Sequence, residues 1–255
     1  MTFGRVAFAF IGTLAIGSRT LPAATILASW QVPAAFPTGV GNVPTGNTYS
    51  MPSTNGTPTS GTLAGNSATI LSTFHSVAGT TYTSPAGNGS QYSFSSNNWS
   101  PGDYYQVVLS TTGVSDLQVS WDQARSSNGP AAFALEMSTD GTTFTRLTTY
   151  TVLQSGGGGA PGTWSTTNYN SLYTNTYDLP GTADNEASLY LRFTNIQAAA
   201  SASGGSNRID NIAISGVSAV PEPSTAAPFV GLAVGGMLLR RRRATLVTKV
   251  SQELG

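Results

Sequence analysis

Side chains that could carry acid–base or metal chemistry are few in this chain of 255 residues, which has one histidine and no cysteine. A hydrolytic triad needs a histidine as its base, and His75 lies in a predicted strand, with no Gly-x-Ser-x-Gly elbow anywhere in the chain. Zinc is disfavoured as well, since one histidine and no cysteine leave only carboxylates as further ligands. We therefore expect His75 to be structural rather than catalytic.

Two carboxylates could act together on a glycan. Asp122 and Glu136 fall on the non-apolar faces of predicted strands that could share one sheet. A glycoside hydrolase needs such a pair about 5–5.5 Å apart for retention, or about 6.5–9.5 Å apart for inversion. The simpler interpretation is that both side chains are solvated on an outer face, so a hydrolase acting through this pair is the alternative hypothesis.

A third candidate is Asp210, which precedes Asn211 in the predicted last strand. Calcium prefers such oxygen ligands, and β-sandwich binding modules often carry one structural calcium ion. The competing interpretation is an ion pair with Arg208 or Arg125, which would satisfy a buried acid without a metal. We favour the ion pair and expect no other cofactor.

Aromatic side chains can stack on sugar rings, and several lie in stretches that read as loops. These residues are Trp99, Trp164, Tyr169, Tyr173 and Tyr177. Packing against the ends of the fold would explain them equally well. The binding hypothesis is that several of them form a polysaccharide-binding strip.

The neutral total charge hides an asymmetry along the chain. Four arginines, no lysine and nine acidic residues lie between Thr25 and Val220, which gives this part a net charge of −5. Binding to a phosphate backbone requires clustered cations. Nucleic acid is therefore disfavoured as a partner.

The elements that must position these side chains are short strands. Apolar and polar residues alternate over 105–109, 117–122, 133–137 and 189–193. Asp140-Gly141 suits a tight hairpin before a return strand over 142–152. Further strands are expected over 25–32 and 208–214, and no stretch in the middle of the chain has the apolar periodicity of a helix. The pattern therefore predicts an all-β fold. We expect one β-sandwich of the jelly-roll type over residues 25–220.

The predicted last strand departs from simple alternation. Ile212 and Ile214 share a face with Asp210, whereas Ile209 points the other way. This slip predicts a β-bulge near Asp210-Asn211, or an acid on the inner face. Because the first and last strands of such sandwiches are commonly neighbours, we expect Trp30 to lie close to Ile212.

Both ends of the chain look like targeting segments. Residues 1–24, with Arg5 ahead of an apolar run, predict a helical secretory signal peptide. At the other end, Pro221, Glu222 and Pro223 precede fourteen uncharged residues, 226–239, which would span about 21 Å as a helix and fall short of a hydrocarbon core of about 30 Å. A cluster of four arginines follows and would hold that end in the cytoplasm: Arg240, Arg241, Arg242 and Arg243.

The tail over residues 221–255 resembles the PEP-CTERM sorting signal of exported bacterial proteins, which an exosortase processes. The resemblance implies exosortase and the secretion machinery as partners, and a short transmembrane-like helix that holds the chain at the inner membrane transiently. The body is similar to that of other such proteins over residues 126–130, 138–141 and 208–212. We therefore expect an exported, non-enzymatic protein of the cell envelope or extracellular matrix that associates with exopolysaccharide or binds glycan.

Overall fold

A computed structural model describes residues 23–30, 32, 43–44, 48–50, 70–156, 158 and 160–218. The predicted signal peptide up to residue 22 and the whole tail, including Pro221-Glu222-Pro223, residues 226–239 and the arginines 240–243, lie outside the described residues. Those predictions therefore stand untested by the structure. Within the described ranges, no helix combines the length and the apolar character needed to span a bilayer.

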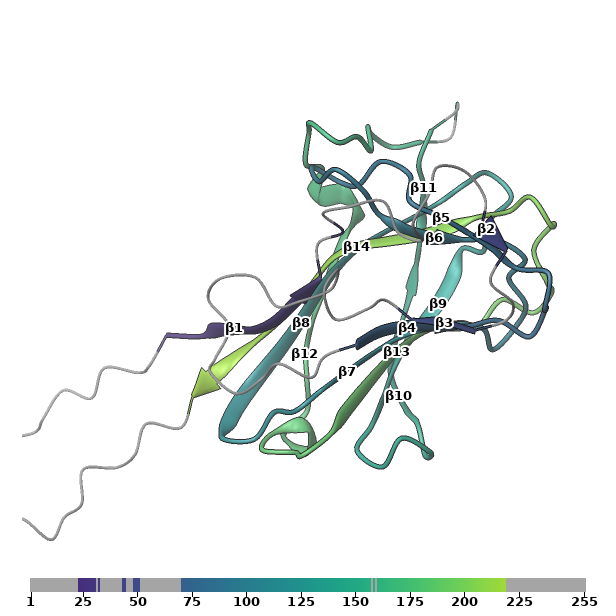
Figure 1. Cartoon of the computed structure of the whole chain (residues 1–255). Coiled ribbons are helices and arrows are strands. Elements are labelled where there is room, and N and C mark those ends of the chain that lie inside the picture. The colour runs from purple at the N-terminus through teal and green to yellow at the C-terminus, as the bar shows by residue number, and fades with distance from the viewer. Residues whose placement is uncertain are drawn as a thin grey trace, which may run out of the picture.

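The described residues form two β-sheets that face each other (Figure 1), which confirms the predicted all-β sandwich. The eight-stranded sheet contains β1 (Thr25–Trp30), β2 (Val43–Pro44), β5 (Thr81–Thr83), β6 (Phe94–Ser96), β8 (Val114–Arg125), β11 (Leu153–Gln154), β12 (Thr174–Asp178) and β14 (Asn207–Ser218). The six-stranded sheet runs in the order β10 (Thr145–Thr151), β9 (Ala132–Ser138), β13 (Leu189–Asn195), β7 (Tyr104–Leu109), β4 (Ile70–Phe74) and β3 (Thr48–Ser50). Two short 3₁₀ helices, η1 (Ser171–Tyr173) and η2 (Gly181–Ala183), flank β12.

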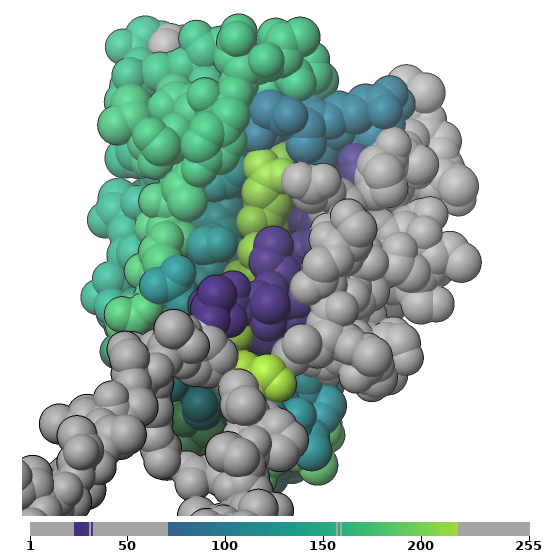
Figure 2. Space-filling view, turned by 90° about the vertical axis from the view of Figure 1, so that its left-hand side faces the viewer, coloured from purple at the N-terminus to yellow at the C-terminus, as the bar shows by residue number. Residues whose placement is uncertain are grey.

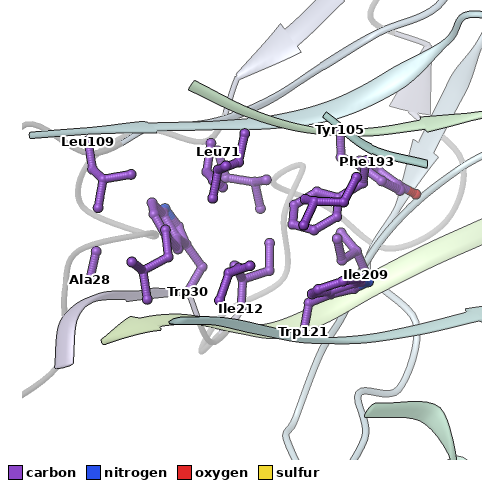
Figure 3. Close-up of a cluster of buried hydrophobic side chains, with 14 of the residues drawn as sticks. Ala28, Trp30, Leu71, Tyr105, Leu109, Trp121, Phe193, Ile209 and Ile212 are labelled. Carbon is purple, nitrogen blue, oxygen red and sulfur yellow. The ribbon is translucent and has the colours of Figure 1, made fainter. Parts of the chain in front are cut away.

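The core lies between the two sheets because each strand turns every second side chain inward. In β7, Tyr105, Val107 and Leu109 are buried while their neighbours are partly exposed. Figure 3 shows Leu71, Tyr105 and Phe193 pointing from the six-stranded sheet toward Trp30 and Trp121 of the other sheet. Burying large apolar side chains of this kind stabilises a fold by roughly 1.5–3 kcal/mol each, so the sandwich needs no disulfide.

Two expectations about the last strand are confirmed. Trp30 of β1 lies opposite Ile212 of β14 in the antiparallel ladder, and Figure 2 shows the purple first strand beside the yellow-green last strand. The register of β14 against β8 slips between Asp210 and Ala213, and Asn211 has a φ of 45°. The bulge thus takes up the slip in alternation, and it leaves Asp210 on the outer face of the sheet, opposite Asp122.

The turn at Asp140-Gly141 is longer than predicted. Gly141 has a positive φ of 74°, but β10 begins only at Thr145, so six residues connect the two strands. The Asp140 carboxylate accepts hydrogen bonds from the backbone N–H groups of Thr142 and Thr143, at 2.7 Å each. This side chain therefore stabilises a wider loop in place of a two-residue turn.

Candidate functional site

The paired-carboxylate hypothesis is wrong. Asp122 belongs to β8 in the eight-stranded sheet, whereas Glu136 belongs to β9 in the six-stranded sheet. Each points away from the core on its own sheet, so both layers of the sandwich separate them. A glycosidic bond cannot lie between two carboxyl groups in this arrangement.

Glu136 instead belongs to a row of polar side chains that crosses the outer face of the six-stranded sheet. In the strand registers Gln106 of β7 lies opposite Arg192 of β13, Arg192 lies opposite Glu136 of β9, and Glu136 lies opposite Arg146 of β10. Residues opposite each other in antiparallel strands point to the same face and can touch. Four adjacent strands, seen side by side in Figure 1, therefore present one continuous polar row.

A cavity of about 460 Å³ lies over this row, and we call it the Arg192 pocket. Its polar lining consists of Tyr104, Glu136, Arg146, Arg192, Thr194 and Asn195, with Pro101, Gly102 and Ile196 completing the wall. The volume falls within the range of about 300–1,000 Å³ that is typical of small-ligand sites.

Arg192 is held firmly at this pocket. Its guanidinium carbon lies 4.0 Å from the ring centre of Tyr104 and 3.5 Å from that of Phe144, and its Nε donates a 2.8 Å hydrogen bond to Oε1 of Gln106. Partial burial lowers the pKa of Arg192, although Tyr104 and Glu136 oppose the shift. An arginine stays charged in such surroundings, so the pocket contains a fixed positive charge.

Arg146 and Glu136 form an ion pair beside it. Arg146 Nη2 lies 3.2 Å from Glu136 Oε1, and the Thr194 hydroxyl donates a 2.8 Å hydrogen bond to Oε2 of the same carboxylate. The arginine side chain is half exposed, so the pair contributes less than about 1 kcal/mol to stability. Its main effect is to orient polar groups at the pocket.

A second polar cluster lies on the outer face of the eight-stranded sheet, around Asp122 and Asp210. Asp122 accepts hydrogen bonds from the side chains of Thr174, Asn88 and Asn211, at 2.5, 2.9 and 2.7 Å. Both acids are buried, because the turn before β6 and the segment that leads into β12 cover them. A β-carbon on Gly87 would lie 2.5 Å from Asp210 Oδ2, so glycine is what lets this turn approach so closely.

The ion pair expected for Asp210 is not found. Asp210 Oδ2 accepts hydrogen bonds from the Ser90 hydroxyl at 2.5 Å and from the Asn88 backbone N–H at 2.9 Å, and neither donor carries a charge. Arg125 instead donates to the backbone oxygens of Val152, Ser126 and Ser127. Burial raises the pKa of Asp210 to about 6, and the neighbouring Asp122 adds to the shift.

The cluster does not fit calcium as it is arranged. Calcium takes six to eight oxygen ligands, but both oxygens of Asp122 and Oδ2 of Asp210 already accept hydrogen bonds from N–H or O–H groups. Asp210 Oδ1 is the one carboxylate oxygen of this cluster without a partner among the described residues. Burial and the charge of Asp122, which outweigh the hydrogen-bond donors, favour a proton on Asp210.

His75 is structural, and its partners are unexpected. Its Nδ1 lies 3.1 Å from Asp103 Oδ2 and its Nε2 lies 3.0 Å from the Ser96 hydroxyl, which is the connectivity of a serine-hydrolase triad. All three side chains are buried, with Ser96 only 2% exposed. A substrate cannot reach them in this conformation, so the three groups connect the end of β4, β6 and the start of β7 in the interior.

The aromatic strip is not present as predicted. Trp99 and Tyr173 are fully buried, at 0% and 1% exposure. Their rings therefore pack inside the protein, where a sugar cannot reach them. Trp164 donates a hydrogen bond to the Ala86 carbonyl and packs edge-on against Tyr173, while Tyr177 donates to the Leu147 carbonyl. Only Tyr169, at 59% exposure, presents a largely free ring.

Sequence reasoning missed Arg192 and Tyr104 as site residues. The available signal was an arginine on the polar face of a predicted strand, 189–193, in a body with only four arginines. Its neighbours across the sheet could not be identified, because a strand's own residues do not show which strands pair with it.

The similarities to known proteins are distant. No family model and no curated protein matches the chain. Among solved structures, the K1 cleaved adhesin domain of Lys-gingipain from Porphyromonas gingivalis W83 is similar at 15% identity, covering 66% of this chain and 98% of that chain, with a TM-score of 0.39. TmCBM61, solved in complex with β-1,4-galactotriose, is similar at 9% identity, covering 58% and 88%, with a TM-score of 0.31. At these scores the likeness carries no functional argument.

Proposed function

We propose that this chain is an exported, non-enzymatic protein whose β-sandwich binds polysaccharide at the Arg192 pocket. The observation that carries the proposal is the convergence of Arg192, the Arg146–Glu136 pair and the Thr194 hydroxyl on one cavity over adjacent strands. Sugars are recognised by such fixed arrays of hydrogen-bonding groups, and strands hold them more firmly than loops do.

Export to the cell envelope or extracellular matrix is the second part of the proposal. It is supported by the signal-like residues 1–24 and by the tail over 221–255, which together imply exosortase and the secretion machinery as partners. We also propose the jelly-roll type for the sandwich, since its first and last strands, β1 and β14, pair with each other.

The test is affinity gel electrophoresis of the secreted protein against a panel of neutral and acidic polysaccharides. We expect retention by at least one polymer. The double variant Arg146→Gln/Arg192→Gln should weaken that retention about ten-fold or more, since hydrogen bonds to charged groups contribute about 1.5–3 kcal/mol each.

Tyr169→Ala tests the alternative binding site, because Tyr169 is the one residue of the predicted aromatic strip whose ring is largely exposed. Loss of binding in this variant, with the arginine variant unaffected, would move the site to the loops around η1. Failure to retain the protein on every polymer would refute the function itself.

A further inference from the structure

The two arginines of the Arg192 pocket differ in how their charges are balanced. Glu136 forms an ion pair with Arg146. Arg192 is close enough to Glu136 for a favourable electrostatic interaction but makes no ion-pair contact with it, and its hydrogen-bond partner Gln106 is neutral. The pocket therefore keeps one positive charge in excess, within a body whose net charge is −5.

The end of the Arg192 guanidinium is free within the described part of the chain. Nε is bonded to Gln106, whereas no described group accepts a hydrogen bond from either terminal nitrogen. The rings of Tyr104 and Phe144 both pack against the group. A planar pair of donors fixed in this way matches the two oxygens of a carboxylate.

The aromatic rings at the pocket are already engaged by other side chains. Arg192 covers one face of Tyr104, and Phe74 stacks on the same ring with centroids 5.5 Å apart. Phe144 packs against Arg192 as well. Stacking on a neutral sugar ring is therefore a poor match for this site, and charge with hydrogen bonding is the better one.

We propose that the Arg192 pocket binds the carboxylate of an acidic sugar, so that the polysaccharide ligand contains uronic acid residues. This proposal rests on the proposed function and specifies its ligand. The Arg192 guanidinium would donate two hydrogen bonds to the carboxylate. Arg146 and Thr194 line the same pocket and would form hydrogen bonds with the sugar hydroxyls.

The acidic character of the body does not prevent this binding. At physiological ionic strength the Debye length is about 8 Å, so acids remote from the pocket are screened from the ligand. The contact with Arg192 is partly desolvated and is screened much less. A second cavity, which contains Asp140 and Glu186, carries the opposite charge and would repel such a ligand.

The test compares polygalacturonate and alginate with the same polymers after their carboxyl groups have been reduced to neutral alcohols. Affinity electrophoresis of the secreted protein should show binding to the acidic forms and a loss of about ten-fold or more on reduction, as expected for a charge-assisted bidentate contact. Arg192→Lys keeps the charge but removes the planar pair of donors, and should lose most of the binding.

Arg208→Lys is the matched control, because it makes the same exchange at a partly exposed arginine on the other sheet. Unfolding curves in urea should show that both variants are folded. Equal binding of the acidic and reduced polymers would overturn the acidic-sugar assignment and leave the proposed function standing. Unchanged binding by Arg192→Lys would also overturn it, whereas no binding to any polymer of the wider panel would refute the proposed function.

Discussion

At the scale of single residues, surroundings decide what an ionisable group does. The sequence contains eleven acidic side chains of similar intrinsic acidity. Asp103 is stabilised as a carboxylate by His75 and by two backbone N–H groups, which hold its pKa below the usual value in spite of burial. Asp210 lacks a charged partner, and burial raises its pKa to about 6. Two buried aspartates in one sandwich are thus expected to differ in protonation at mildly acidic pH.

Asp210 should make the stability of the protein depend on pH. Its pKa rises from 3.8 in the unfolded chain to about 6 in the fold, so the folded state binds the proton more tightly. The resulting stabilisation is complete below pH 4 and is lost as the pH rises through about 6; a shift of this size corresponds to about 3 kcal/mol. Asp210→Asn should remove this dependence, as measured by urea unfolding of both proteins between pH 4 and 7.5.

The same variant tests the calcium alternative. Parallel pH profiles for the two proteins would contradict the raised pKa. A melting temperature that rises with millimolar calcium in the original protein, and not in Asp210→Asn, would show that a metal ion rather than a proton balances the charge.

At the scale of elements, β14 organises the sandwich. It pairs with β1, β6 and β8, and its bulge turns Asp210 and Asn211 toward the loops that cover the outer face. Asn211 donates from Nδ2 to Asp122 Oδ2 and to the Asn88 carbonyl, at 2.7 and 2.9 Å. Through these two hydrogen bonds, one residue with a left-handed backbone conformation connects the bulge to a neighbouring strand and to a loop.

Two substitutions at Asn211 separate its two roles. Asn211→Gly loses the side-chain hydrogen bonds but accepts the φ of 45° without strain, whereas Asn211→Ala loses the bonds and also carries the backbone strain. We expect both to destabilise the fold, with alanine worse than glycine by about 1 kcal/mol. Denaturant unfolding measures the difference, and equal stabilities would show that the backbone conformation costs nothing here.

At the scale of the whole molecule, the first and last described strands lie next to the predicted targeting segments in the chain. Thr25 at the start of β1 lies opposite Gly216 near the end of β14, so the two ends of the described strands lie close together. No described strand extends past Ser218. Removing residues 221–255 would therefore leave every described strand intact.

The proposed sorting role of residues 221–255 is tested by cell fractionation. We expect the full chain to be released in a form whose mass shows cleavage near Pro221, because the tail is the proposed exosortase signal. A chain that ends at Val220 should be exported without passing through a membrane-held intermediate. Release of an uncleaved full chain, at the same rate with and without the tail, would contradict the proposed sorting.

The sequence by itself determined the fold class and much of the last strand. Alternation of apolar and polar residues located β7, β8, β9, β13 and β14, because a strand buries every second side chain whatever its neighbours are. The slip at Asp210-Asn211 indicated the bulge for the same reason. The short strands β5, β6 and β12 gave no such signal, because they consist largely of threonine, serine and asparagine in stretches that resemble loops.

The tertiary structure alone decided which side chains meet. It placed Asp122 and Glu136 on opposite layers, buried Trp99 and Tyr173, and aligned Gln106, Arg192, Glu136 and Arg146 across four strands. The physical reason is that alternation assigns a residue to a face of its own strand, whereas strand order and register come from contacts between residues far apart in the chain. The Arg192 pocket depends on that order, so no local pattern could have revealed it.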